Sequence, residues 1–350
     1  MHTYQISKNQ LNQLLEPYLQ VGAHLIAPSL NSLGQVSYNK IQNINEIALN
    51  TCIPLKPPKS YLFPESSTLV QFDEKNPHLL ESDASHSIQK QMIFGLRPCD
   101  LSAIAYLDAF FTSNISDHDY AQRRENTLIV GIACEYPSNA CFCTSMGIEP
   151  GNCANADIFV VPQGQEYLIE GLTVKGQEYL ATLSKDWKEI SPELITGRKN
   201  EITEQSSSKL IEHIDLSKIR GRLNEIYASD FWNKYSEACI ACGACTFDCP
   251  TCSCFDVNDT LKSSTVGCRY RSWDSCSFGD FTLHASGHNP RSSKLHRLRQ
   301  RIMHKYHYTV EKMDLWSCTG CGRCIRVCPV GINTRSILKD AKEALGEPNN

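Results

Sequence analysis

Apolar positions recur with both helical and strand-like spacing in the first part of the chain. Residues 8–20 place leucines on one helical face, with Ser7 as an N-cap, and Pro17 ends or kinks that helix. Residues 101–111 have the same helical spacing. Short apolar runs predict strands at residues 23–26, 68–72, 91–94, 127–133 and 157–161. This mixture predicts an α/β domain.

The order strand, helix, strand over residues 91–133 predicts one right-handed βαβ unit on a parallel sheet. Helical spacing returns later in the chain, at residues 216–227, 295–306 and 332–345. The polar stretch at residues 195–209 indicates a linker or an exposed loop. We therefore predict an α/β N-terminal domain over residues 1–215 and a mostly α-helical C-terminal domain over residues 216–350.

Composition narrows the class of protein. A chain of 350 residues is long enough for two domains that each bury a core. The formal net charge of −4 at pH 7 argues against a general nucleic-acid binder. No basic segment followed by an apolar one begins the chain, and the apolar run at residues 128–133 is too short to span a bilayer. Eighteen cysteines then indicate metal-binding thiolates in a reducing cytoplasm rather than a disulfide framework.

Two runs of cysteines have the C-x2-C-x2-C-x3-C-P spacing of bacterial ferredoxins. In this pattern three thiolates hold one [4Fe–4S] cluster, and the fourth Cys, followed by Pro, holds the cluster of the other run. The first set of predicted ligands is Cys239, Cys242, Cys245 and Cys328. The second set is Cys318, Cys321, Cys324 and Cys249. Zinc is the alternative, but two complete runs favour clusters, and so a protein that handles electrons. The distance between the runs predicts an insertion at about residues 252–310.

Four further cysteines follow the strands of the predicted βαβ unit. Cys99 follows the first strand and begins the helix, a position that favours its thiolate, and Cys134 follows the second strand. Cys141 and Cys143 lie in the next loop. Parallel strands end at one edge of a sheet, so these four cysteines form a third set and predict a third cluster. The alternative is that they are small buried side chains.

The remaining cysteines have less defined roles. Cys153 is a candidate replacement ligand for the third set, and the isolated Cys52 is expected in the core. Four cysteines lie in the insertion: Cys252, Cys254, Cys268 and Cys276. Cys252, Cys254 and Cys276 could ligate another metal centre, or these residues could support the second cluster.

Six Lys or Arg residues and no acidic residue lie between positions 291 and 305. Such a run is most often a solvated helix face, and the alternatives are docking on an acidic partner or stabilising anionic clusters. Asp100, Asp274 and His288 could act as acid–base groups, but no motif pairs them, and no nucleotide-binding glycine pattern is present. We therefore expect an electron carrier without a substrate site of its own. The rival is an enzyme with a redox site at the insertion cysteines.

Several segments together resemble one protein family. They are Leu62-Phe-Pro64, Gly95-Leu-Arg-Pro-Cys-Asp100, Cys141-Phe-Cys-Thr-Ser-Met-Gly147, Cys249-Pro-Thr-Cys-Ser-Cys-Phe-Asp256, Trp273-Asp-Ser-Cys276, Gly287-His-Asn289 and His304-Lys305. The family contains the beta subunit of sulfhydrogenase-type cytosolic [NiFe] hydrogenases and the A subunit of anaerobic sulfite reductase. The resemblance extends from about residue 55 to about residue 340.

This resemblance implies an iron–sulfur subunit that passes electrons between a flavin- and NAD(P)H-binding subunit and a catalytic subunit. By this resemblance, all three sets of cysteines are expected to be cluster ligands. Residues 58–64 look like the hydrogenase branch, whereas Cys153 is similar to the sulfite reductase branch. A component of a heterodisulfide-reductase-linked complex is a further alternative. A zinc-stabilised interaction module is the alternative of another class.

Overall fold

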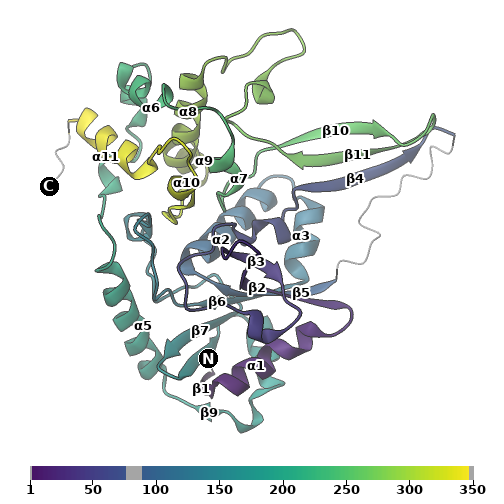
Figure 1. Ribbon diagram of the computed structural model, residues 1–350, viewed down its shortest axis with the longest axis vertical. Coiled ribbons are helices and arrows are strands. Elements are labelled where there is room, and N and C mark those ends of the chain that lie inside the picture. Colours follow the sequence, from purple (N-terminus) through teal and green to yellow (C-terminus); the bar gives the residue numbers. More distant parts are fainter. Residues whose placement is uncertain (1, 76–88, 347–350) are drawn as a thin grey trace.

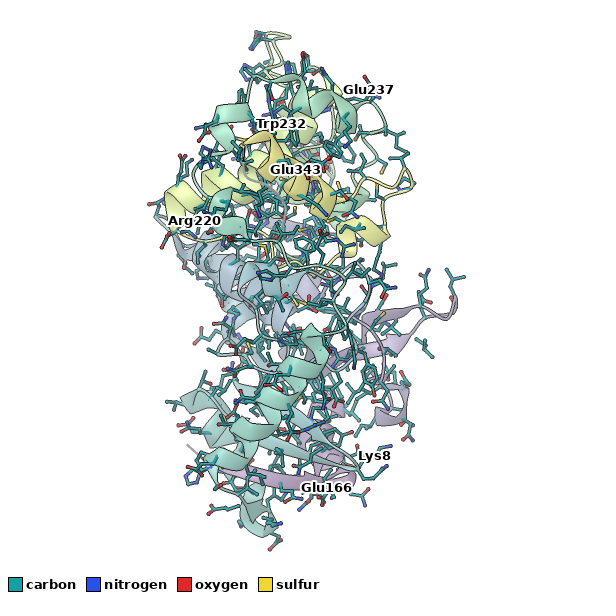
Figure 2. The ribbon with its side chains drawn as sticks, turned by 90° about the vertical axis from the view of Figure 1, so that its left-hand side faces the viewer. Lys8, Glu166, Arg220, Trp232, Glu237 and Glu343 are labelled. Carbon is teal, nitrogen blue, oxygen red and sulfur yellow. The ribbon has the colours of Figure 1, made fainter. Side chains whose placement is uncertain are left out.

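The computed structural model describes residues 2–75 and 89–346, which form two parts (Figure 1). A large sheet with flanking helices makes one part, and short helices joined by long loops make the other. In the side view of Figure 2, Lys8 and Glu166 lie at the sheet end, and Trp232, Glu237 and Glu343 lie at the opposite end. Among the described residues, no helix is long and apolar enough to cross a bilayer.

The large sheet has eight strands in the order β3-β2-β5-β6-β7-β8-β1-β9. They are β1 (Thr3–Ser7), β2 (Ala23–Leu30), β3 (Val36–Lys40), β5 (Lys90–Leu96), β6 (Thr127–Ile132), β7 (Ile158–Gln163), β8 (Glu166–Gly171) and β9 (Lys188–Glu189). Strands β2, β5, β6 and β7 are parallel and confirm four predicted strands, because buried central strands read as continuous apolar runs. The outer strands pair antiparallel and were not predicted.

The predicted βαβ unit is confirmed, since β5, α2 (Pro98–Thr112) and the parallel strand β6 follow one another. Helix α1 (Lys8–Leu15) begins after Ser7, which forms a capping box with Gln10. Alternate residues of the central strands face two separate cores, as Ile93 and Met92 show. Other helices and turns of this part are η1 (Glu16–Leu19), η2 (Ile44–Glu46), η3 (Pro58–Tyr61), α3 (His118–Glu125), η5 (Cys143–Met146), α4 (Val174–Ala181) and η6 (Ser184–Asp186).

The polar stretch predicted as a linker is a helix, so that prediction was wrong. Helix α5 (Pro192–Ser207) runs along the sheet part toward the second part (Figure 1). Ile195 and Ile202, two helical turns apart, pack into the sheet core, and Lys199 forms a buried ion pair with Glu170. Only a few apolar residues mark this face, which explains why the sequence pattern was weak.

The insertion contains a β-hairpin that was not predicted. The strands of this smaller sheet are β4 (Ser66–Asp73), β10 (Phe255–Leu261) and β11 (Val266–Trp273). β11 lies in the middle and pairs with β4 of the first part, so the strand predicted at residues 68–72 is confirmed but joins the insertion. Arg271 of β11 is buried and pairs with Asp117 and Asp119 near the start of α3. The β10 side chains are largely exposed, so β10 carries no strand-like apolar pattern.

The second part is less helical than predicted. The helices predicted at residues 295–306 and 332–345 are confirmed, but residues 216–227 form two short 3₁₀ turns instead. These turns bury Leu216, Leu223 and Ile226, which accounts for the helix-like spacing. The elements are η7 (Leu216–Lys218), η8 (Leu223–Ile226), η9 (Asp230–Trp232), α6 (Asn233–Ser236), α7 (Ala244–Phe247), η10 (Asp280–Thr282), α8 (Lys294–Met303), η11 (His304–Tyr308), α9 (Thr309–Met313), α10 (Arg323–Arg326) and α11 (Thr334–Ala344).

Candidate metal centres

The four thiols of the first set line one cavity of about 50 Å³. Cys239 and Cys242 reach it from the loop that leads into α7, Cys245 reaches it from the first turn of α7, and Cys328 reaches it from the second run. Gly243 turns this loop with a φ of 77°, and a Cβ there would stand 2.7 Å from the Phe278 ring. The fold therefore brings the last cysteine of the second run to the first run, as the ferredoxin spacing predicts.

This cavity lies close to solvent and has a positive rim. Cys242 is exposed, and Ile240, which also lines the cavity, keeps 60% of its surface exposed. Lys294 and Arg297 complete the rim, and both donate hydrogen bonds to backbone carbonyl oxygens. Neither has a carboxylate partner in the part of the chain that the structure describes, so their positive charge remains available to an anionic group nearby.

The second set of cysteines is buried more deeply than the first set. Cys249 and Cys321 are both buried. Burial is the main cause that raises the pKa of Cys321 to about 12, and the nearby Cys249 adds to the rise. Cys324 lies 3.4 Å from the Thr334 hydroxyl and also borders the cavity of the first set. The two sets are therefore neighbours.

Lys305, which belongs to the basic run, points at a ligand of the second set. Its Nζ donates to Cys249 Sγ at 3.2 Å, to Thr251 Oγ1 at 3.0 Å and to the Ser317 carbonyl oxygen at 2.7 Å. Burial opposes its charge, but the neighbouring sulfurs of Cys249 and Cys252 outweigh burial and raise the pKa of Lys305. A cation in this position stabilises negative charge on sulfur.

Two more buried cations, Arg301 and Lys59, accompany Lys305. Arg301 donates to Cys252 Sγ at 3.4 Å, and Lys59 donates to the Cys252 carbonyl oxygen at 2.9 Å. None of the three cations has a carboxylate partner within residues 2–75 and 89–346. Nearby Cys249 and Cys252 favour the charged form of all three side chains, although burial still lowers the pKa of Lys59. The basic run is thus split between surface and interior. Arg301 and Lys305 lie four residues apart, next to the buried apolar residues of α8. Sequence analysis missed this spacing, which indicated that both side chains face the interior.

The third set lies beside the second. Cys99, Cys141 and Cys143 are buried in one group with Cys321, and Cys134 is close enough to Cys143 to raise its pKa. Burial raises the pKa of Cys134 to about 11 and that of Cys99 well above its usual value. At Cys99 burial therefore opposes the thiolate that the N-terminus of α2 favours.

Two glycines allow the second run to approach the third set. Gly320 and Gly322 have φ values of 61° and 73°, and a Cβ at either would stand within 2.5 Å of a carbonyl oxygen of Phe142 or Ala140. The Phe142 N–H donates to the Gly320 carbonyl oxygen at 2.7 Å. This contact holds the loop that carries Cys141 against the second run.

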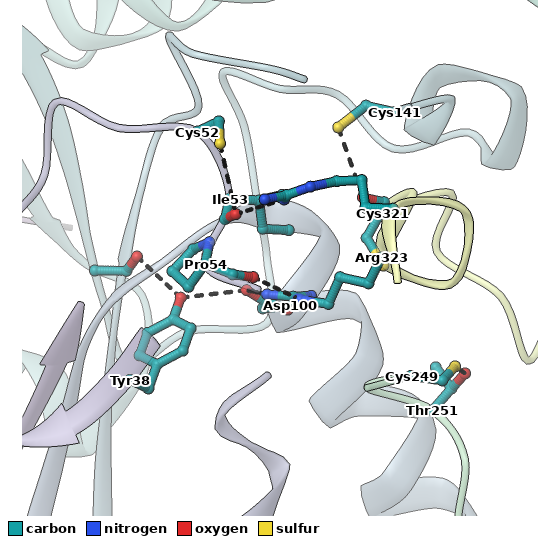
Figure 3. Close-up of polar contacts among 12 residues, drawn as sticks. Tyr38, Cys52, Ile53, Pro54, Asp100, Cys141, Cys249, Thr251, Cys321 and Arg323 are labelled. Carbon is teal, nitrogen blue, oxygen red and sulfur yellow. Dashed lines mark hydrogen bonds and ion pairs between the residues drawn. The ribbon is translucent and has the colours of Figure 1, made fainter. Parts of the chain in front are cut away.

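A buried ion pair joins the R-P-C-D segment to the same run (Figure 3). Arg323 donates to the two Asp100 carboxylate oxygens at 2.6 and 3.0 Å, and its Nε donates to the Pro54 carbonyl oxygen at 2.8 Å. The Tyr38 hydroxyl donates to Asp100 at 3.2 Å. Both charged side chains are fully buried. Asp100 therefore links the two parts of the chain rather than serving as an exposed acid–base group.

The other cysteines are dispersed. Cys153 packs in the sheet core near α5 rather than with the buried group of the third set. Cys52 is exposed, so its expected place in the core was wrong. Cys254 and Cys276 line one cavity together, and Cys268 is buried in β11. The structure thus separates these residues into one pair and several single thiols.

The surroundings of the first and second sets fit iron–sulfur clusters. Backbone N–H groups donate to Cys239, Cys318 and Cys328 sulfurs at 3.4, 3.4 and 3.2 Å. Such donors stabilise anionic thiolates and tune cluster potentials. In the described part of the chain, no group of three or more Cys, His, Asp or Glu side chains is arranged to hold a single metal ion.

Comparison with known proteins agrees with this chemistry. Residues 238–332 match the family model of a 4Fe–4S dicluster domain. The chain is therefore an iron–sulfur protein with a ferredoxin-type domain for two [4Fe–4S] clusters. It is also 30% identical over 308 residues to Sulfhydrogenase 2 subunit beta of Pyrococcus furiosus, which covers 88% of this chain and 89% of that protein. The chain belongs to the family of iron–sulfur beta subunits of the sulfhydrogenase type.

Proposed function

We propose that this chain relays electrons inside a hydrogenase-type complex, through [4Fe–4S] clusters held by the first and second sets. A bound cluster supplies reversible one-electron chemistry. The chain's own residues hold the thiolates in place and donate hydrogen bonds to them, as Lys305 does to Cys249. The observation that carries the proposal is the cavity in which Cys328 joins the three thiols of the first run.

Exchanging the fourth cysteine of each set tests this assignment. Cys328→Ser should alter the electron paramagnetic resonance (EPR) signal of the first cluster, and Cys249→Ser that of the second. Cys268→Ser is the control, since Cys268 is buried but belongs to neither set. If Cys328→Ser changed the same signal as Cys318→Ser, the crossed assignment would be wrong. Anaerobic protein that contained zinc and no iron would instead support the zinc-stabilised module.

We also propose a third cluster at Cys99, Cys134, Cys141 and Cys143. Its support is the burial of these thiols beside Cys321, within the contact that Gly320 permits. Cys99→Ser should remove about a third of the iron and one EPR signal, while Cys52→Ser, a change at an exposed cysteine, should leave both unchanged. Equal iron content in the two variants would reject a third cluster.

The partners of this relay are inferred from the family. We propose a flavin- and NAD(P)H-binding subunit on one side and a catalytic hydrogenase subunit on the other, in the cytoplasm. The exposed first set, with Lys294 and Arg297 on its rim, suits docking of an acidic redox partner. The alternative is a place in an anaerobic sulfite reductase or in a heterodisulfide-reductase-linked complex. Purification of the native complex, followed by assays with hydrogen and with sulfite, distinguishes these partners.

The proposed division into residues 1–215 and 216–350 has one consequence for the relay. The third set belongs to the first domain and the other two sets to the second, so the third set meets the second set where the domains touch. The contact between Phe142 and Gly320 and the ion pair between Asp100 and Arg323 support this arrangement. No substrate site is needed in the chain for this role.

A further inference from the structure

Two insertion cysteines are brought together by the hairpin. Cys254 precedes β10 and Cys276 follows β11 by a few residues. The hairpin closes with Phe255 opposite Trp273, and the Asp274 N–H donates to the Cys254 carbonyl oxygen at 3.0 Å. The hairpin therefore brings the chain segments that carry Cys254 and Cys276 close together.

These thiols lie apart from the cavity of the first set. Cys254 and Cys276 line one cavity together and each shifts the pKa of the other, whereas neither lines the cavity of the first set. Both side chains are only partly buried. Two thiols on the wall of one cavity, carried on chain segments that the hairpin pairs, are placed to form a disulfide.

The pair opens on a cavity of about 300 Å³. Phe110, Phe255 and Phe281 line it together with Arg291, Gln300 and His304. The cavity is distinct from the one that the first set lines. Its aromatic and polar lining fits a small organic molecule with an apolar body and a polar end.

We propose that Cys254 and Cys276 form a redox-active dithiol that exchanges with a small organic disulfide bound in this cavity. The Cys254 thiolate attacks one sulfur of the ligand, whose S–S bond breaks and releases one thiolate. Cys276 then gives its proton to solvent and attacks the Cys254 sulfur, which releases the second thiolate. The pair has then lost two electrons to the ligand and forms a protein disulfide. Two electrons and one proton restore the starting state.

The surroundings support different roles for the two thiols. The neighbouring Cys276 thiol is the main cause that lowers the pKa of Cys254, and the neighbouring Cys254, with burial, raises the pKa of Cys276. Cys254 is therefore the attacking thiolate and Cys276 the thiol that resolves the mixed disulfide. Cys252 lies near both this pair and the second set, since it affects the pKa of Cys254 and of Cys249. The supply of electrons to the pair rests on the proposed relay function.

Thiol release and peptide mapping test the proposal on the full chain with its clusters in place. A Cys52→Ser background removes the exposed single thiol. Under anaerobic conditions, the reduced protein should release two thiols from hydroxyethyl disulfide and gain a Cys254–Cys276 cross-link that a reductant reverses. Cys276→Ser should release one thiol and keep a mixed disulfide on Cys254, and Cys254→Ser should release none. Cys268→Ser, on the same hairpin, should behave as the parent protein.

Two results would overturn the proposal. In the first, both thiols remain free for alkylation after treatment with the disulfide. In the second, both resist alkylation in reduced protein and Cys276→Ser loses iron, which would make them metal ligands. The relay can fail separately, because a chain without iron can still form the cross-link. Conversely, a chain with the expected iron and no cross-link would reject the dithiol alone.

Discussion

Replacing Asp100 with Asn tests whether its ion pair with Arg323 holds the two parts of the chain together. The change conserves the size of the side chain but leaves the Arg323 guanidinium buried without its carboxylate. Removing one member of a buried pair costs about 3–5 kcal/mol, because the remaining charge has lost both water and its partner. We expect a loss of about 4 kcal/mol, roughly a thousandfold in the folding equilibrium.

Anaerobic unfolding in urea, followed by tryptophan fluorescence, measures this loss. Asp259→Asn is the matched control, because Asp259 pairs with Arg269 in the same charge combination on the exposed hairpin, where solvent screens the pair. The double variant Asp100→Leu/Arg323→Met should lose less stability than the sum of its single changes, since it leaves no charge unpaired. If Asp100→Asn cost no more than Asp259→Asn, or if the double variant were additive, the pair would not link the two parts.

The contacts around the second set lead to three further predictions. Lys305→Met should lower the midpoint potential of the second cluster in a redox titration by tens of millivolts, where about 60 mV corresponds to 1.4 kcal/mol for one electron. The surface variant Lys294→Met should leave the potential of the second cluster unchanged. Gly320→Ala should lower the melting temperature and the iron content, because its Cβ would meet a carbonyl oxygen at 2.5 Å, while Gly279→Ala, with open space, should be neutral. In the chain stripped of its clusters, burial raises the pKa of the Cys321 thiol to about 12. The protonated thiol should therefore contribute its full stability below pH 9, and this contribution should be lost as the pH rises toward 12. Thermal unfolding followed by circular dichroism measures this, and a stability that stayed constant from pH 9 to 12 would contradict it.

Local patterns predicted the central elements of the fold well. The four parallel strands and α2 are buried on both sides, so their apolar runs are nearly continuous and easily recognised. The outer strands and the hairpin have mixed or exposed residues, and their pairing depends on partners far away in the sequence. α5 was missed for a related reason, since its buried face consists of a few residues such as Ile195 and Ile202 among many polar ones.

The candidate metal centres also combine features that the sequence predicts with features that depend on the tertiary structure. By itself the sequence determined that the chain carries two ferredoxin-type runs, because the size of a cluster dictates the spacing of its nearest ligands along the chain. Only the tertiary structure decided that Arg301 and Lys305 turn inward, that Asp100 meets Arg323, and that Cys254 and Cys276 line one cavity. These contacts join segments far apart in the chain, and no local spacing encodes them. They depend on how strands, helices and loops pack, which sets the charge and the access around each thiol.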